Sequence, residues 1–327
     1  MAAPGAAFAV APGFDHTAAG PPHAGGATPG GKPMRWEDFR RSDNVEDRRG
    51  AGGGFGGGGG FRGGGLGIGG LIVVGLLAWA TGINPAILLG GAEAIFGEGR
   101  QTRQEAPAAR TGAPSDQLGQ FASAVLAQTE DVWVELFKAQ GKTYEKPRMV
   151  LFSGATRSGC GAAQSAMGPF YCPLDQKVYL DLSFFQELKD RFRAPGDFAA
   201  AYVIAHEVGH HVENQIGLLA KVQERQRQAS REEANALSVR VELMADCLAG
   251  VWAYHANDRF RILEAGDVEE ALNAATAIGD DTLQKRSQGY AVPDSFTHGT
   301  SKQRSTWFTR GLKTGSMQQC NTFQGGI

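Results

Sequence analysis

The chain has little net charge, few cysteines and no closely spaced pair of thiols. Its 327 residues carry a formal net charge of −2, so a broad affinity for nucleic acids or other polyanions is not expected. Only four cysteines occur, and the absence of a Cys-x-x-Cys pair argues against a zinc site built on thiolates. No charged residue lies between Arg62 and Glu93. This last absence marks a candidate membrane segment.

Glycine is abundant, with 47 residues, and is concentrated in the first part of the chain. Residues 1–33 are mainly alanine, glycine and proline, which bury too little apolar surface to fold. A different, charged segment begins at Met34, so Met1 and Met34 are both candidate starts of the chain. A second glycine-rich run over residues 50–70 is typical of a flexible spacer. We therefore expect residues 1–65 to form a disordered N-terminal region.

Residues 66–90 form an apolar stretch that is long enough for one transmembrane helix, which needs about 20 mostly apolar residues. Trp79 is typical of an interfacial anchor. Arginines are more numerous before this stretch than after it. The positive-inside rule therefore predicts a single span with the N-terminus in the cytoplasm and the body outside. Two alternatives remain, a cleaved signal peptide suggested by Ala78-Trp79-Ala80 and a buried core helix.

A polar linker is expected over residues 91–114, and the folded body over residues 115–327. Ser115 or Asp116 can cap a helix, because apolar residues follow at helical spacing to about residue 140. The body as a whole reads as α+β and mostly helical, with a small sheet.

Two short strands are expected in the body. Residues 148–153 form an apolar run, and residues 177–182 alternate like a half-buried strand. The second strand is either an edge strand that aligns an extended substrate or a plain structural strand. Ser183 and Asp197 are expected to cap the helices that follow them.

The even number of cysteines fits two disulfides if the body faces an oxidising compartment. Three pairings are compatible with four cysteines. We expect Cys160 with Cys172, which would close one loop, and Cys247 with Cys320, which would tie the C-terminus to a central helix. Buried free thiols are the alternative.

The motif that organises the chain is His-Glu-x-x-His at residues 206–210. Residues four apart lie on one face of a helix, so His206 and His210 are placed to bind one Zn²⁺. Glu207 lies beside them and can act as a general base on a water bound to the metal. An ordinary helix with two histidines and a surface glutamate is the alternative.

A catalytic zinc site needs a third protein ligand and one open position. The metzincin spacing would place a third histidine where Ile216 stands, which argues against that class. Glu213 lies on the same helix, where a third ligand would give poor tetrahedral geometry. His211 points to another side of the helix and reads as a core or surface histidine.

The better third ligand is Glu242, on a predicted helix over residues 235–255. Asp246 follows it by four residues and so shares its face. A carboxylate in that position can accept the outer N–H of a zinc-bound histidine and fix its orientation.

The two segments together resemble the gluzincins, the thermolysin-like zinc peptidases with two histidine ligands and one glutamate. The match is closer to the bacterial neutral zinc metallopeptidases, since HEVGHHVEN, ELMADCLAGVWA, IGDDTLQ and SFTHGTSKQRSTWF look like that family's signature blocks. The resemblance covers roughly residue 34 to the end. It implies a zincin-like body, Zn²⁺ as cofactor, and a protein or peptide substrate. Its implied ligands are His206, His210 and Glu242, supported by Asp246.

These observations predict a membrane-anchored zinc endopeptidase in the bacterial inner membrane, with its body in the periplasm. Glu207 is the expected base and proton carrier. His298, just before a predicted helix, is the candidate donor to the oxyanion, by analogy with a late histidine in thermolysin-like enzymes. A capping or packing role for His298 is the alternative, and Tyr290 is a weaker candidate.

Two other functions are compatible with the same motif. One is a membrane-tethered interaction module that binds zinc without catalysis, although such a module has no use for a base at Glu207. The other is a zinc amidase that cuts cell-wall peptide.

Overall fold

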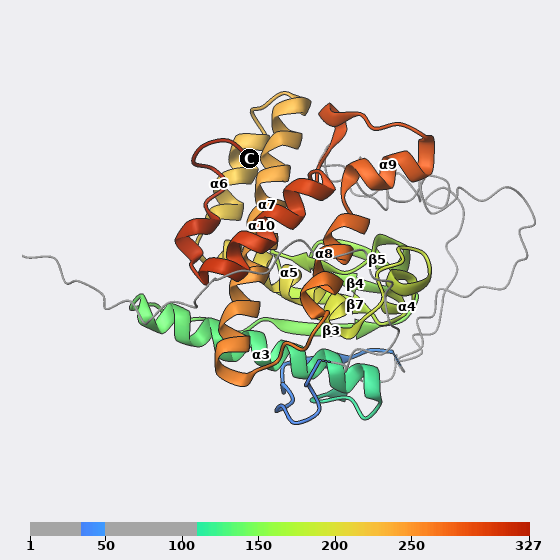
Figure 1. Ribbon diagram of the computed structural model, residues 1–327, viewed down its shortest axis with the longest axis vertical. Helices are drawn as coiled ribbons and strands as arrows, with labels where there is room; N and C mark the ends of the chain where they lie inside the picture. Colours follow the sequence, from blue (N-terminus) through green and yellow to red (C-terminus); the bar gives the residue numbers. More distant parts are fainter. Residues whose placement is uncertain (1–33, 50–109) are drawn as a thin grey trace, which may run out of the picture. The chain divides into compact units, whose positions relative to one another are not determined.

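The computed structural model describes residues 34–49 and 110–327 (Figure 1). Most of these residues are helical. The helices are α3 (Gln117–Ala139), α4 (Ser183–Asp190), α5 (Asp197–Gln215), α6 (Leu218–Gln226), α7 (Arg231–Phe260), α8 (Asp267–Ala277), α9 (Asp280–Gln288) and α10 (Ser301–Thr314), with 3-10 turns at η1 (Ser165–Met167), η2 (Pro293–Ser295) and η3 (Met317–Cys320). The strands are β1 (Val45–Asp47), β2 (Arg110–Thr111), β3 (Arg148–Phe152), β4 (Ala155–Ser158), β5 (Gly161–Gln164), β6 (Phe170–Cys172) and β7 (Lys177–Asp181). The predicted class, mostly helical α+β with a small sheet, is confirmed.

Five strands form one sheet in the order β2-β1-β3-β7-β6, and β4 and β5 form a separate hairpin. The strands β1, β3 and β7 run parallel, so Met149 of β3 lies between Val45 of β1 and Val178 of β7. Of the two alternatives for the strand at residues 177–182, the structure supports the plain structural strand, although its side chains do not alternate between buried and exposed positions. β7 is buried from Val178 onward and has β3 on one side and β6 on the other. With no free backbone edge, β7 cannot align a substrate by strand addition.

Residues 34–49 belong to the folded body, which differs from the disordered N-terminal region expected over residues 1–65. Met34 is fully buried, and Val45 lies in β1 beside β3. The buried Glu130 of α3 accepts hydrogen bonds from Arg40 and Asn44, each at 2.8 Å. A few apolar side chains and one buried carboxylate thus fix a segment whose own sequence is mostly charged.

The body also begins earlier than predicted on the other side of the gap. β2 lies within the expected linker, residues 91–114, and pairs antiparallel with β1. Glu46 faces Thr111 in this pair. Two residues of local sequence carry no strand periodicity, so this strand is defined by its pairing with β1 and not by a local pattern.

The N-terminus of α3 forms as predicted, because the Asp116 side chain accepts the Gly119 N–H at 3.0 Å. The predicted cap at the next helix is wrong. Ser183 is the first residue of α4, and its N–H donates to the Asp181 carboxylate at 3.0 Å. The terminal residue of β7 therefore also orders the start of α4.

The predicted cap of α5 is also wrong. Asp197 is the first residue of this helix, and the capping position is occupied by Gly196, which has no side chain to form a capping bond. The Phe198 N–H instead donates to Glu270 of α8 at 3.1 Å. A carboxylate that is distant in sequence thus takes over the role expected of a local one.

The helices α5 and α10 both pack on α7 at close range (Figure 1). A Cβ atom on Gly209 of α5 would lie 3.0 Å from the Ala245 carbonyl oxygen of α7. A Cβ atom on Gly250 of α7 would overlap the backbone of α10 at Phe308. Absent side chains at these two positions let the backbones approach closely, which fixes the separation of the helices.

Both predicted disulfides are present, Cys160–Cys172 and Cys247–Cys320. The second joins α7 to η3 and so ties the C-terminal segment to the helix that carries Glu242.

The predicted disorder of residues 1–33 and the predicted span at residues 66–90 lie outside the described residues. Within residues 34–49 and 110–327, no helix combines the length and the apolar character needed to cross a membrane.

Candidate metal centre

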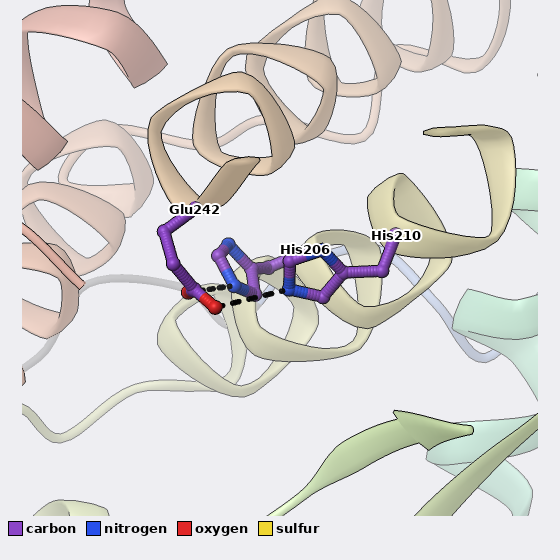
Figure 2. Close-up of side chains that lie close together, drawn as sticks. All are labelled: His206, His210 and Glu242. Carbon is purple, nitrogen blue, oxygen red and sulfur yellow. Dashed lines mark ion pairs between the residues drawn. The ribbon is translucent and has the colours of Figure 1, made fainter. Parts of the chain in front are cut away.

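The three predicted metal ligands come together between α5 and α7, as Figure 2 shows. The Nε2 atom of His206 lies 3.2 Å from Glu242 Oε2, and that of His210 lies 3.6 Å from Glu242 Oε1. Zinc bonds of about 2.0–2.1 Å in a tetrahedron separate two ligand atoms by about 3.3 Å. Both distances therefore fit ligands that share one zinc ion. Two imidazoles and one carboxylate are also the donor set of a catalytic rather than a structural zinc site.

Each imidazole has its other nitrogen held by a carboxylate. His206 Nδ1 lies 2.9 Å from Asp246 Oδ1, and His210 Nδ1 lies 2.8 Å from Glu213 Oε2. Carboxylates at both Nδ1 atoms place the protons there and leave the Nε2 lone pairs directed at Glu242. Asp246 thus lies where it was predicted, whereas Glu213 was considered only as a poor ligand and proves to be the support of His210.

The electrostatics of the site favour a cation. Burial acts to lower the pKa of His206, but Asp246 and Glu242 outweigh it and raise this pKa to about 10. Burial also acts to lower the pKa of His210, and the charges of Glu242 and Glu213 raise it above its usual value. The carboxylates therefore stabilise positive charge between the two imidazoles. Because a ligand imidazole must be neutral, protons and a metal ion compete for this position.

Asp246 is itself held by residues that the sequence did not single out. It is fully buried and accepts hydrogen bonds from Arg304 Nε and Nη2, each at 2.9 Å, and from the Tyr202 hydroxyl at 2.5 Å. Arg304, on α10, is also almost fully buried. Burial acts to raise the pKa of Asp246, but Arg304 and His206 lower it to about 2. Arg304 and Tyr202 thus hold Asp246 as an ionised carboxylate in the orientation that contacts His206.

Glu207 lies next to the ligands on α5 and is almost fully buried, with 8% of its surface exposed. Among residues 34–49 and 110–327, no hydrogen-bond donor contacts its carboxylate, so no structural bond ties the group down. Burial raises its pKa above the usual glutamate value, although the charges of His206 and His210 act in the opposite direction. A buried carboxylate without structural hydrogen bonds fits the role of a proton carrier. It does not fit the alternative of an ordinary surface glutamate.

His298 lies on the loop before α10, and Asp280 holds it in place. Its Nδ1 is 3.2 Å from Asp280 Oδ1, and Asp280 Oδ2 accepts the backbone N–H groups of Thr297, His298 and Gly299 at 2.7, 2.6 and 3.1 Å. Burial acts to lower the pKa of His298, but the charges of Glu242 and Asp280 raise it. His298 thus lies within electrostatic range of Glu242, one of the three predicted metal ligands. The imidazole is still about one-third exposed, as a group that meets a substrate must be.

Two other candidates are His211 and Tyr290. His211 lies in the core, and Tyr290 lies on the surface. His211 is fully buried, and its ring nitrogens contact the Tyr171 hydroxyl and the Glu145 carbonyl. Burial lowers its pKa to about 4, so it is a neutral core histidine. Tyr290 is 63% exposed, and no contact places it at the metal centre.

A second carboxylate cluster lies at the other end of α5. Asp197, Asp267 and Glu270 bring their oxygens within 4.8 Å of one another. Burial, reinforced by neighbouring carboxylates, raises the pKa of Asp267 to about 6 and that of Glu270 to about 7. These side chains sit at the N-termini of α5 and α8, where N–H groups of Phe198 and Glu264 donate to them. Their contacts are those of helix-terminal acceptors.

Comparison with known proteins places all but the last four of the described residues in one family. The profile of the family described as "Putative neutral zinc metallopeptidase" matches residues 34–323. "Uncharacterized protein YpfJ" of Escherichia coli K12 is 53% identical over 292 residues, which cover 89% of this chain and 99% of that protein. "Uncharacterized protein Mb2605" of Mycobacterium bovis is 41% identical over 225 residues, which cover 65% of this chain and 74% of that protein. No solved structure gave a significant match. The chain belongs to the neutral zinc metallopeptidase family, whose cofactor is Zn²⁺.

Proposed function

We propose that the protein is a zinc-dependent endopeptidase whose reaction takes place at the metal centre between α5 and α7. The observation that carries this proposal is the convergence of His206, His210 and Glu242 within zinc-ligand distances, with Glu207 beside them. An interaction module needs the ligands but not Glu207. Membership of a zinc metallopeptidase family supports peptide-bond hydrolysis as the reaction class.

His206, His210 and Glu242 would hold the zinc ion, which would supply a Lewis acid to polarise the scissile carbonyl and to make the attacking water more acidic. Glu207 accepts the proton of the attacking water and passes it to the leaving amine. Burial makes its carboxylate a stronger base, because it raises the pKa above the usual glutamate value. Asp246 and Glu213 keep both imidazoles in one orientation through the cycle.

His298 is proposed to donate to the oxyanion that forms as the carbonyl is attacked. Asp280 engages its Nδ1, and a raised pKa favours the protonated ring, in which Nε2 is also a donor. A cationic donor fixed by a buried carboxylate stabilises developing negative charge without reorganising. The protein thus supplies a base and an electrophilic donor from different helical segments.

The test is the conservative replacement Glu207→Gln in the purified full-length protein. We expect zinc content and folding to be unchanged and peptide hydrolysis to fall by about 10²–10⁴-fold, the usual contribution of a general acid–base group. Glu232→Gln, an exposed glutamate in the first turn of α7, is the matched control and should leave activity unchanged. A Glu207→Gln protein that cleaves peptides as fast as its parent would show that Glu207 is not the base.

We also propose that the body works in an oxidising, extracytoplasmic compartment. Two disulfides, Cys160–Cys172 and Cys247–Cys320, support this location, because such bonds are rare in reducing cytoplasm. Alkylation of thiols immediately after lysis, followed by mass spectrometry of the intact chain, should find all four cysteines protected. Four alkylated cysteines would place the body in the cytoplasm.

A further inference from the structure

The segments on the two sides of the apolar stretch, residues 66–90, meet in one sheet. β1 precedes this stretch, whereas β2 and β3 follow it. Glu46 of β1 nevertheless pairs with Thr111 of β2 and with Val150 of β3. Paired strands lie about 4.7–4.9 Å apart, but the hydrocarbon core of a bilayer is about 30 Å thick. Strands on opposite sides of a membrane therefore cannot form these pairs.

The segment that carries β1 is bound to the body by more than strand pairing. Met34 is fully buried, and Trp36 contacts Phe121 of α3 edge to face at 5.6 Å. Arg40 forms ion pairs with Glu130 at 2.8 Å and Asp131 at 2.6 Å. Of these partners, Glu130 is 1% exposed, and without the segment its cationic partner would be Lys146 alone, at the longer distance of 3.5 Å. The body thus needs residues 34–49 in its own compartment.

Three of the arginines that predict a cytoplasmic N-terminus, Arg40, Arg48 and Arg49, have partners in the same body. Arg48 pairs with Glu46 at 2.8 Å and donates to the Arg157 carbonyl of β4 at 2.9 Å. Arg49 pairs with Asp47 and with Asp116 at the start of α3, each at 2.6 Å. These arginines are therefore bound to the body on which they pack, and their charge count alone does not separate residues 34–49 from it.

We propose that residues 66–90 do not carry the chain across a bilayer, so that residues 34–49 and 110–327 occupy one compartment. An even number of crossings would also satisfy the sheet, but the sequence offers only one apolar run of sufficient length. A second span needs about 20 further apolar residues. Residues 50–65 are mainly glycine, and residues 93–105 contain five charged side chains. This proposal does not depend on the peptidase reaction.

The test compares two single-cysteine variants of the full-length chain in bacterial spheroplasts. Asp38→Cys places a thiol on residues 34–49 at a side chain that is 83% exposed, and Lys142→Cys places one at an exposed position of the body. The parent chain is labelled in parallel and its signal is subtracted, because its four cysteines react wherever the two disulfides are not formed. A membrane-impermeant maleimide is applied before and after detergent lysis, and the labelled chain is measured by its mass shift.

We expect the two variants to behave alike, both labelled in intact spheroplasts or both labelled only after lysis. The first pattern also agrees with an extracytoplasmic body. One variant labelled in intact spheroplasts and the other only after lysis would overturn the proposal and restore a single span. An unchanged melting temperature in both variants shows that the reporters leave β1 in place.

Discussion

Substitution of Arg304 would perturb the metal centre without changing any of the three predicted ligands. The side chain lies on α10 and contacts no ligand carboxylate. It donates two hydrogen bonds of 2.9 Å to Asp246, whose Oδ1 lies 2.9 Å from His206 Nδ1. Arg304→Met keeps most of the side-chain volume and removes the charge. Asp246, which is fully buried, then loses its only cationic partner other than a protonated His206 among the described residues.

The size of the effect follows from this burial. Removing one partner of a buried ion pair costs about 3–5 kcal/mol. For a domain of this size, each kcal/mol lowers the melting temperature by about 2–4 °C, so we expect a fall of roughly 10 °C. Asp246 also loses the clamp that aims it at His206, and loss of such support weakens metal binding by about 10–100-fold. Arg304→Lys keeps the charge but not the two parallel hydrogen bonds. Its melting temperature and zinc affinity should therefore lie between those of the parent and those of Arg304→Met.

The assay is calorimetric melting of the metal-free protein together with zinc titration against a competing chelator. Arg310→Met is the matched control, because Arg310 lies on the same helix but is exposed. The double variant Asp246→Asn with Arg304→Met removes both charges of the pair and should lose less stability than the two single losses added together. A melting temperature and a zinc dissociation constant that both equal those of the Arg310→Met control would refute the reasoning.

Three further predictions concern other parts of the fold. The pKa of Glu270 is raised to about 7 from an ordinary value of 4.5, so the unfolded chain ionises first and stability falls as the pH rises from about 4.5 to 7. After discounting for solvent exposure, Glu270→Gln should add about 1 kcal/mol at pH 8 and nothing at pH 4, measured by denaturant titration. Gly209→Ala presses a methyl group on the Ala245 carbonyl and should cost about 1–3 kcal/mol and weaken zinc binding. Replacing Cys247 and Cys320 by serine opens a loop of 73 residues and should cost about 4 kcal/mol in thermal melting, and an unchanged melting temperature would contradict it.

The local parts of the site could be predicted because helical spacing encodes them. His206 and His210 are one turn apart, as are Glu242 and Asp246, so each pair needs only a helix to share a face. The cap at Asp116 is equally local. Pairing the two helices required chemical reasoning about ligands, which named Glu242 correctly as the residue that meets the histidines.

The remaining features depend on contacts that no local pattern records. Arg304 meets Asp246 across 58 residues, and a lone arginine in an amphipathic helix gives no sign of burial. The interior position of β7 depends on where β3 and β6 pair, which periodicity does not specify. Asp197 looks like a cap from its neighbours, but Glu270 reaches the helix end from α8. Glu213 did carry a signal, since its spacing of three from His210 also suits a supporting carboxylate.

The close backbone contact between α7 and α10 has a consequence for how the protein acquires its metal. Gly250 lets the two helices touch, and the bond from Cys247 to Cys320 closes the same region. Glu242 and Arg304 therefore lie on two helices whose separation is set by backbone contact and a disulfide, and not by the metal ion. We expect zinc uptake to proceed at a rate set by diffusion and by displacement of protons, without the slow ordering step of proteins that fold around their metal.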